Sequence, residues 1–199
     1  MEDKTIKILP IKYFIFSCIM IFFLFISGQM ITPASPQKVL GKYYIDCTNI
    51  AKNWSGPFDE DGIPLTDYKE FGIQYQPVGI AQYALGTWDL YLENNDPQYK
   101  ERFIHMADWF CDNLLVEDDF GIWEYKFDFP RYNLKAPWPS AMAQGEGISV
   151  LTRAYQLTEN KKYIEIARLA LNSFKASIKT GGYCIKIKKV LSGMKSILH

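Results

Sequence analysis

Two short segments combine residue types that could bind the carboxylate or sulfate groups of a sugar. Residues 75–85 and 137–149 each contain proline, an aromatic ring, glutamine and small residues. If each segment opens a helix, the free N–H groups and the positive dipole end of that helix favour an anion. The same composition is also typical of tight helix packing alone. The residues expected to bind are Gln76, Gln82, Trp138, Ser140, Gln144 and Glu146.

Helices are needed to position these segments, and the apolar pattern predicts four of them. Apolar residues recur at three- and four-residue steps, which is typical of one face of a helix. We expect helices over residues 77–92, 97–115, 140–157 and 161–178, with Pro77 and Pro97 at first helical positions. Trp88, Tyr91 and Trp109 lie on packing stripes and are expected in the core.

The two predicted helical pairs repeat one another, which indicates a mainly α fold. Tyr91, Tyr99 and Phe110 recur as Tyr155, Tyr163 and Phe174 at a constant offset of 64, and Ala81-Gln82 recurs as Ala143-Gln144 at an offset of 62. Repeated αα-hairpins stack to bury faces that one hairpin cannot bury alone. The prediction is part of an (α/α)6 toroid with the first helix of each pair inside. An open helical bundle is the alternative.

The segments outside these helices are rich in turn formers and aromatic residues. Residues 41–75 could hold strands or loops, and residues 117–138 form an aromatic loop interrupted by Gly121, Pro130 and Pro137. Alternation over residues 122–127 also permits a hairpin there. A long ordered loop is more often functional than idle.

The N-terminus has the layout of a targeting signal. Lys4, Lys7 and Lys12 precede an apolar run at residues 13–26, with Ser27 and Gly28 after it. Both a cleaved signal peptide and an uncleaved membrane anchor fit residues 1–31, because the run is marginally long enough to span a bilayer. The lysines favour a cytoplasmic N-terminus. The chain after this segment is expected on the non-cytoplasmic side of the membrane. That side is the Golgi lumen in a eukaryote, and the cell surface or periplasmic side in a prokaryote.

Composition argues against two classes of partner. Lys plus Arg and Asp plus Glu are both 22, so the net charge is zero and nucleic-acid binding is not expected. Four cysteines without a C-x-x-C pair and two histidines give no support for a metal site. The aromatic content of 16% suits either core packing or the stacking of sugar rings.

The amino-acid sequences of the two candidate segments resemble those of a known family. Pro-Trp-Pro-Ser-Ala-Met-Ala-Gln-Gly at 137–145 and Tyr-Gln-Pro-Val-Gly-Ile-Ala-Gln-Tyr at 75–83 are similar to the C-terminal domain of D-glucuronyl C5-epimerases. The resemblance covers residues 68–182. It implies an α/α toroid, no metal or nucleotide cofactor, and an isomerase that converts D-glucuronate to L-iduronate in heparan- or heparosan-type acidic polysaccharide by removing the proton beside the carboxylate.

The family's catalytic segments have no counterpart in this chain, so no catalytic residue is assigned. Residues 32–67 are expected to be a linker and mixed segment, and residues 183–199 an atypical basic tail. We expect a truncated domain; a short variant completed by homodimerisation and a short enzyme using Glu146, Arg153 and Tyr132 are alternatives. A non-catalytic glycan-binding or vestigial fragment and a toroid-fold polysaccharide lyase are the competing functions.

Overall fold

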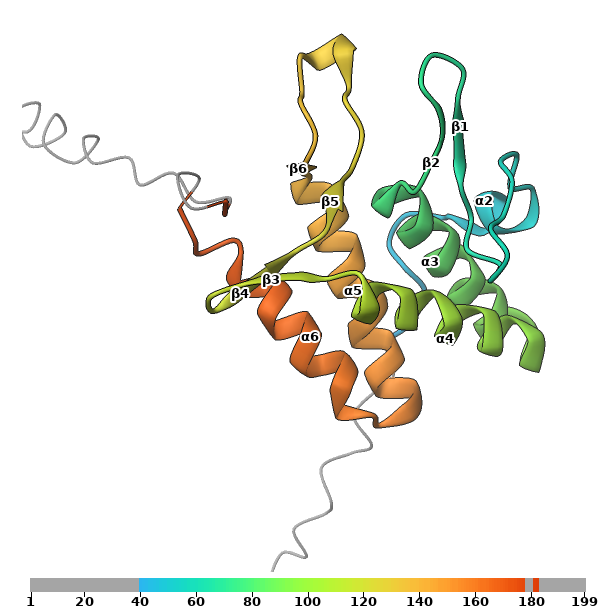
Figure 1. Ribbon diagram of the computed structural model, residues 1–199. Helices are drawn as coiled ribbons and strands as arrows, with labels where there is room; N and C mark the ends of the chain where they lie inside the picture. The colour runs from blue at the N-terminus through green and yellow to red at the C-terminus, as the bar shows by residue number, and fades with distance from the viewer. Residues whose placement is uncertain (1–39, 178–180, 183–199) are drawn as a thin grey trace, which may run out of the picture. The chain divides into compact units, whose positions relative to one another are not determined.

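The computed structural model describes residues 40–177 and 181–182, and this part of the chain is mainly helical (Figure 1). The predicted signal or anchor segment, residues 1–31, and the predicted basic tail, residues 183–199, lie outside it. No helix among the described residues is long and apolar enough to cross a bilayer. The elements are α2 (Thr48–Lys52), β1 (Thr66–Tyr68), β2 (Gly72–Gln74), α3 (Pro77–Asn94), α4 (Pro97–Asp112), β3 (Leu115–Glu117), β4 (Phe120–Ile122), β5 (Glu124–Tyr125), the 3-10 helix η1 (Pro130–Tyr132), β6 (Trp138–Pro139), α5 (Ala141–Thr158) and α6 (Lys161–Asn172).

The four long helices form two hairpins, α3 with α4 and α5 with α6, close to the predicted ranges. Pro77 and Pro97 occupy first-turn positions, as expected, because their missing N–H groups would have no helical partner there. α4 ends earlier than predicted, since Leu115–Glu117 leave the helix to pair with β4. The described residues therefore contain the predicted αα-hairpins, and no closed ring is seen among them.

The offset of 64 residues holds for the backbone as well as for the aromatic residues. α3 and α5 are both 18 residues long. Each ends on a residue in the left-handed conformation, Asn95 and Glu159. The next residue, Asp96 or Asn160, caps the following helix with its side chain. Two separate stretches of sequence therefore build the same helix–turn–helix unit.

The hairpins share one core. α3 packs against α5, each lies beside its own partner helix, and α4 also contacts α5 (Figure 1). Trp88, Phe103, Phe110, Trp123 and Leu151 are all completely buried in this core. Trp109 and Tyr91, expected in the core, are only partly buried at its margin.

Three two-stranded antiparallel sheets connect the helices. β3 pairs with β4, whereas β5 pairs with β6 at the entry to α5. The hairpin expected in the aromatic loop is present, because Glu124–Tyr125 of the alternating stretch pair with Trp138–Pro139. Tyr68 and Phe71 of the β1–β2 hairpin pack against Phe127 beyond β5, with ring centroids 5.3 and 5.2 Å from it, so aromatic packing joins the two segments.

The segment before α2, residues 40–47, lies across α3 and α5, and we call it the covering segment. Its Leu40 N–H donates to Gln156 of α5 at 2.8 Å, and its Tyr43 N–H donates to Asp89 of α3 at 2.9 Å. The Gly41 carbonyl accepts from the Trp88 indole at 3.3 Å. These long-range bonds fix a chain segment that the sequence pattern left without defined structure.

Candidate functional site

A hydrogen bond links the two inner helices at equivalent positions. Gln82 and Glu146 are each the sixth residue of their helix. The Gln82 amide donates to one carboxylate oxygen of Glu146 at 3.2 Å, across 64 residues of sequence. Both were predicted as site residues, and the structure brings them together.

The second carboxylate oxygen of Glu146 is buried and has no hydrogen-bond partner among the described residues. The residue is 4% exposed. Burial raises the pKa of the Glu146 carboxyl, and the bond from Gln82 offsets only part of that rise. An unmatched buried carboxyl costs stability, and a raised pKa suits proton transfer near neutral pH.

Glu146 lines a hollow of about 640 Å³ between α5 and the covering segment. Arg153 lies two turns along α5, is 7% exposed, and bonds to the Ser149 hydroxyl at 2.6 Å. Its guanidinium carbon is 5.4 Å from the centre of the Tyr43 ring, a cation–π distance. The hollow is lined by Lys42, Tyr43, Tyr44, Ala141, Met142, Gly145, Glu146, Ser149 and Arg153.

The charges around this hollow are incompletely paired. Arg153 makes no salt bridge among the described residues, and its Nε is buried without a partner. Asp89 is 1% exposed and accepts the Tyr43 N–H; burial raises the pKa of its carboxyl despite that bond. Lys42 is paired with Glu93 at the surface. Arg153 is therefore the cation best placed to attract an anionic ligand.

The two predicted helix starts meet through a residue that the sequence did not single out. The Tyr125 hydroxyl accepts the Val78 N–H in the first turn of α3 at 3.4 Å and also bonds to the Ser140 side chain. Burial raises the pKa of Tyr125 to about 12. Trp138 stacks on Tyr125 with ring centroids 4.0 Å apart and planes at 11°. Tyr125 thus spans both helix N-termini.

Three other predicted site residues have structural partners. Ser140 caps α5 through the Ala143 N–H at 3.4 Å. Gln76, at the start of α3, accepts from the Thr66 hydroxyl at 3.1 Å. Trp138 donates its indole N–H to the Phe127 carbonyl at 2.8 Å. Ser140 and Trp138 are half-buried. They lie near Tyr125, and neither lines the hollow beside Glu146.

Gln144 is fully buried and its amide is engaged on both sides. The amide nitrogen donates to the Gly121 carbonyl at 2.6 Å and to the Ala170 carbonyl at 3.0 Å, while the oxygen accepts the Trp123 N–H at 3.4 Å. Gln144 therefore ties α5 to β4 and α6. Contact with a ligand would require these bonds to break, so Gln82 and Gln144 do not line a common groove in this structure.

Comparison with known proteins supports the resemblance for the candidate segment at residues 137–149. Residues 117–192 match the family model described as D-glucuronyl C5-epimerase C-terminus. The D-glucuronyl C5-epimerase of Caenorhabditis elegans is 39% identical over 89 residues, covering 43% of this chain and 14% of that protein.

This part of the chain therefore resembles the C-terminal domain of D-glucuronyl C5-epimerases. An uncharacterized Methanocaldococcus jannaschii protein, MJ1128, is 29% identical over 147 residues, 63% of this chain and 48% of that protein. The chain thus spans less than half the length of each of these two relatives. No solved structure matches.

Several residues of the site gave no clear sequence signal. Tyr43 and Lys42 fall in a stretch predicted as linker and mixed segment, and Asp89 is flanked by the apolar residues Trp88 and Leu90 of α3. One signal was present: the offset of 64 pairs Gln82 with Glu146, whereas the motif offset of 62 pairs it with Gln144. No group of three or more His, Cys, Asp or Glu within the described part of the chain could hold a metal ion.

Proposed function

We propose that this chain binds a uronate-containing polysaccharide in the hollow beside Glu146 and takes part in epimerising the uronate at C5. The observation that carries the proposal is the buried carboxyl of Glu146, whose second oxygen has no partner among the described residues, in a hollow that Arg153 also lines. The resemblance to D-glucuronyl C5-epimerases suggests the reaction class.

The reaction requires groups that these residues could supply. The C5–H bond breaks, its electron pair spreads onto the neighbouring carboxylate, and a base receives the proton; delivery of a proton to the opposite face then inverts the centre. Arg153 would stabilise the negative charge that develops on the carboxylate. Glu146 would accept the proton. Burial raises the pKa of the Tyr43 hydroxyl, which keeps it protonated as the donor for the opposite face.

We also propose that the two hairpins are consecutive repeats of an α/α toroid, with α3 and α5 on the inside. The equal lengths of α3 and α5, the matching caps of α4 and α6, and the constant offset support this arrangement. The extracytoplasmic location expected from residues 1–31, and a homodimer that would complete the core, remain proposals as well.

Deuterium exchange tests the chemistry directly. The full chain is incubated with heparosan-type polymer in deuterated water, and deuterium at C5 is followed by NMR. Glu146→Gln should slow incorporation by at least about 100-fold, and Arg153→Met should weaken binding, whereas Arg168→Met, at an exposed arginine of α6, should do neither. Unchanged incorporation in Glu146→Gln would remove Glu146 from the mechanism.

A binding role without chemistry is the second candidate. It is favoured by the lining of the hollow, in which Lys42, Tyr43, Tyr44 and Arg153 suit binding while Glu146 supplies its one carboxyl group. Polymer binding that depends on Arg153, with no deuterium incorporated, would establish it. A product absorbing in the ultraviolet would instead identify the lyase, which eliminates after removing the same proton.

A further inference from the structure

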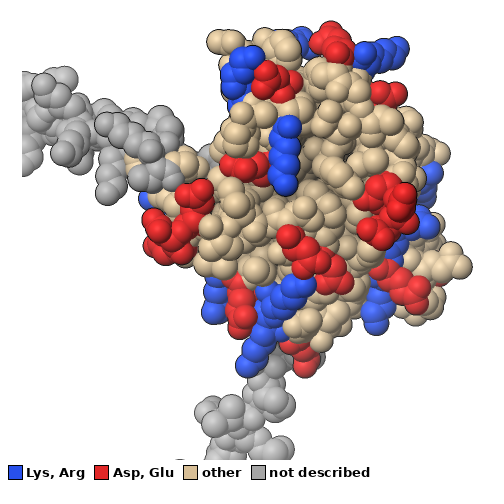
Figure 2. Space-filling model, viewed as in Figure 1, with Lys and Arg blue, Asp and Glu red and all other residues tan. Residues whose placement is uncertain are grey.

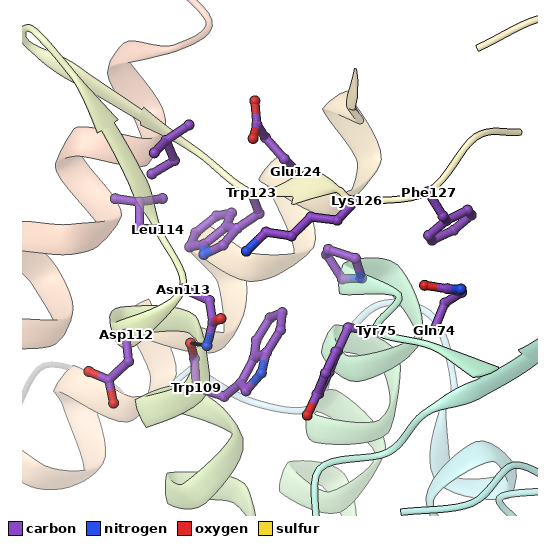
Figure 3. A pocket seen from close by; sticks show the side chains of 12 residues that line it. Gln74, Tyr75, Trp109, Asp112, Asn113, Leu114, Trp123, Glu124, Lys126 and Phe127 are labelled. Atoms are coloured by element: carbon purple, nitrogen blue, oxygen red, sulfur yellow. Dashed lines mark hydrogen bonds between the residues drawn. The ribbon is translucent and has the colours of Figure 1, made fainter. Parts of the chain in front are cut away.

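A second hollow, of about 270 Å³, shares no lining residue with the one beside Glu146. It lies where the end of α4, the β3–β5 region and the junction between β2 and α3 meet (Figure 3). Its volume is just below the roughly 300–1,000 Å³ of pockets that take drug-sized ligands, which suits one sugar ring better than an oligosaccharide.

Two aromatic rings form a platform at one side of this hollow. Tyr75 and Trp109 are nearly parallel, with planes at 23° and centroids 6.1 Å apart. Figure 3 shows the two rings side by side, with the Lys126 side chain extended above them in that view. The Tyr75 hydroxyl donates to Asp59 at 2.6 Å, which holds the ring in place although the residue is 46% exposed.

The spacing of the rings limits how a ligand can bind. A flat ring inserted between them would need roughly 7 Å, two van der Waals contacts of about 3.5 Å each. The ligand must therefore lie on the ring faces, whose negative potential attracts the weakly positive C–H groups of a pyranose.

Polar groups surround the platform and are free to bond to hydroxyl groups. The Trp109 indole N–H has no hydrogen-bond partner among the residues described. The Asn113 and Gln74 amide nitrogens donate to backbone carbonyls, at 3.0 and 3.1 Å. The oxygen atoms of these two amides accept no hydrogen bond from any described residue. Such planar amide groups match the adjacent donors and acceptors of a sugar.

The charges at this hollow balance. Lys126 has no ion-pair partner within the described ranges, and Glu124 contributes the opposite charge beside it. Asp112 is already paired with Lys162 at 3.0 Å. The lining therefore gives no net attraction for a carboxylated or sulfated ring.

We propose that this hollow binds one uncharged hexopyranose unit, stacked on Tyr75 and Trp109 and hydrogen-bonded by Lys126, Gln74 and Asn113. None of the residues assigned above to uronate chemistry takes part. The site would add affinity for a carbohydrate whether or not the chain epimerises it.

Saturation-transfer difference NMR on the full chain, with methyl β-D-glucopyranoside, methyl β-D-galactopyranoside and methyl α-D-mannopyranoside up to about 50 mM, tests the proposal. At least one glycoside should bind. Tyr75→Ala should weaken that binding by about fivefold, because the stacking face is lost, while Tyr75→Phe keeps the ring and should change it less than about twofold. Lys126→Met, at an exposed side chain, should weaken it by about threefold and serves as the second variant if Tyr75→Ala unfolds.

Two further measurements separate this site from the hollow beside Glu146. Glu146→Gln should leave glycoside binding unchanged, so the proposal can stand if the epimerase proposal fails. Sodium glucuronate should bind this hollow more weakly than the best glycoside. The proposal would be overturned if none of the three glycosides bound. It would also be overturned if neither Tyr75→Ala nor Lys126→Met weakened glycoside binding, or if glucuronate bound as tightly as the best glycoside and its binding depended on Tyr75.

Discussion

At the scale of the residue, the repeat places different chemistry at equivalent positions. The amide of Gln82 and the carboxyl of Glu146 occupy the same turn of α3 and α5, and they bond to each other. Two amides there would be neutral at every pH. The carboxyl instead introduces a buried group whose charged form is disfavoured by desolvation.

The pH dependence of folding should report this group. The Glu146 pKa is raised above its ordinary value of 4.5, so the folded chain binds its proton more tightly than the unfolded chain does. The resulting stabilisation is complete below the unfolded pKa and is lost as pH rises through the folded pKa. Glu146→Gln should therefore gain free energy of unfolding relative to the wild type between pH 4 and pH 8, measured by urea denaturation.

Glu165→Gln, at an exposed glutamate of α6, is the matched control. Its stability relative to the wild type should vary less with pH than that of Glu146→Gln. A Glu146→Gln difference that is constant from pH 4 to pH 8 would contradict the burial of an ionisable carboxyl at this position.

At the scale of the element, the two hairpins differ in how well their sequences fit the same backbone. The turn after α3 uses Asn95 at φ 52°, and the turn after α5 uses Glu159 at φ 58°. Asparagine tolerates the left-handed conformation better than glutamate does, because its short side chain can bond locally. The second hairpin therefore carries the less favourable turn.

Glu159→Gly should raise the free energy of unfolding by about 1 kcal/mol, since glycine has no Cβ to clash in this conformation. Asn95→Gly should gain only a few tenths of a kcal/mol by the same reasoning. Both changes are read from urea denaturation midpoints. Equal gains at the two positions would show that the residue type at the turn is not what distinguishes the hairpins.

Close packing on α5 gives another prediction for this element. A methyl group at Gly147 would lie 2.7 Å from the Trp123 ring and 3.0 Å from Phe110, whereas nothing lies within 4 Å of one at Gly145. Gly147→Ala should cost about 1–3 kcal/mol of stability by overpacking. Gly145→Ala should be neutral or gain up to about 1 kcal/mol, because alanine favours the helix. Thermal unfolding of the pair of variants tests this, and equal stability would contradict the observed packing.

At the scale of the whole molecule, the two hairpins of the described chain share one core despite their repeat. α3 packs on α5, α4 also contacts α5, and Trp123 from the connecting segment lies in the same core. On the face drawn in Figure 2, acidic and basic side chains are interspersed without an extended patch of one sign.

Phe103→Ala in α4 should cost about 3–5 kcal/mol, because a fully buried ring that packs on Trp88 is lost. Since the hairpins share a core, amide protection in α6 should fall together with that in α3, as measured by hydrogen exchange. Leu171→Ala, at a residue that is 49% exposed, should change stability by less than about 0.5 kcal/mol. Loss of protection confined to α3 and α4 would mean that the hairpins fold separately.

The sequence by itself determined the helical hairpins, the proline starts of two helices and the repeat. These follow from local rules, namely apolar periodicity, proline at Pro77 and Pro97, and the constant offset of 64. The offset of 64 also places Gln82 and Glu146 at equivalent positions. The Ala-Gln motif, at an offset of 62, instead suggests that Gln82 is equivalent to Gln144.

Only the tertiary structure decided which of the predicted polar residues are available to a ligand. The side-chain amide of Gln144 is fully engaged in hydrogen bonds to three distant backbone groups. Tyr125 contacts the first turns of two helices, and the covering segment lies across α3 and α5. These outcomes depend on contacts between residues far apart in sequence. A buried amide must satisfy whatever backbone groups surround it, and no local pattern specifies those groups.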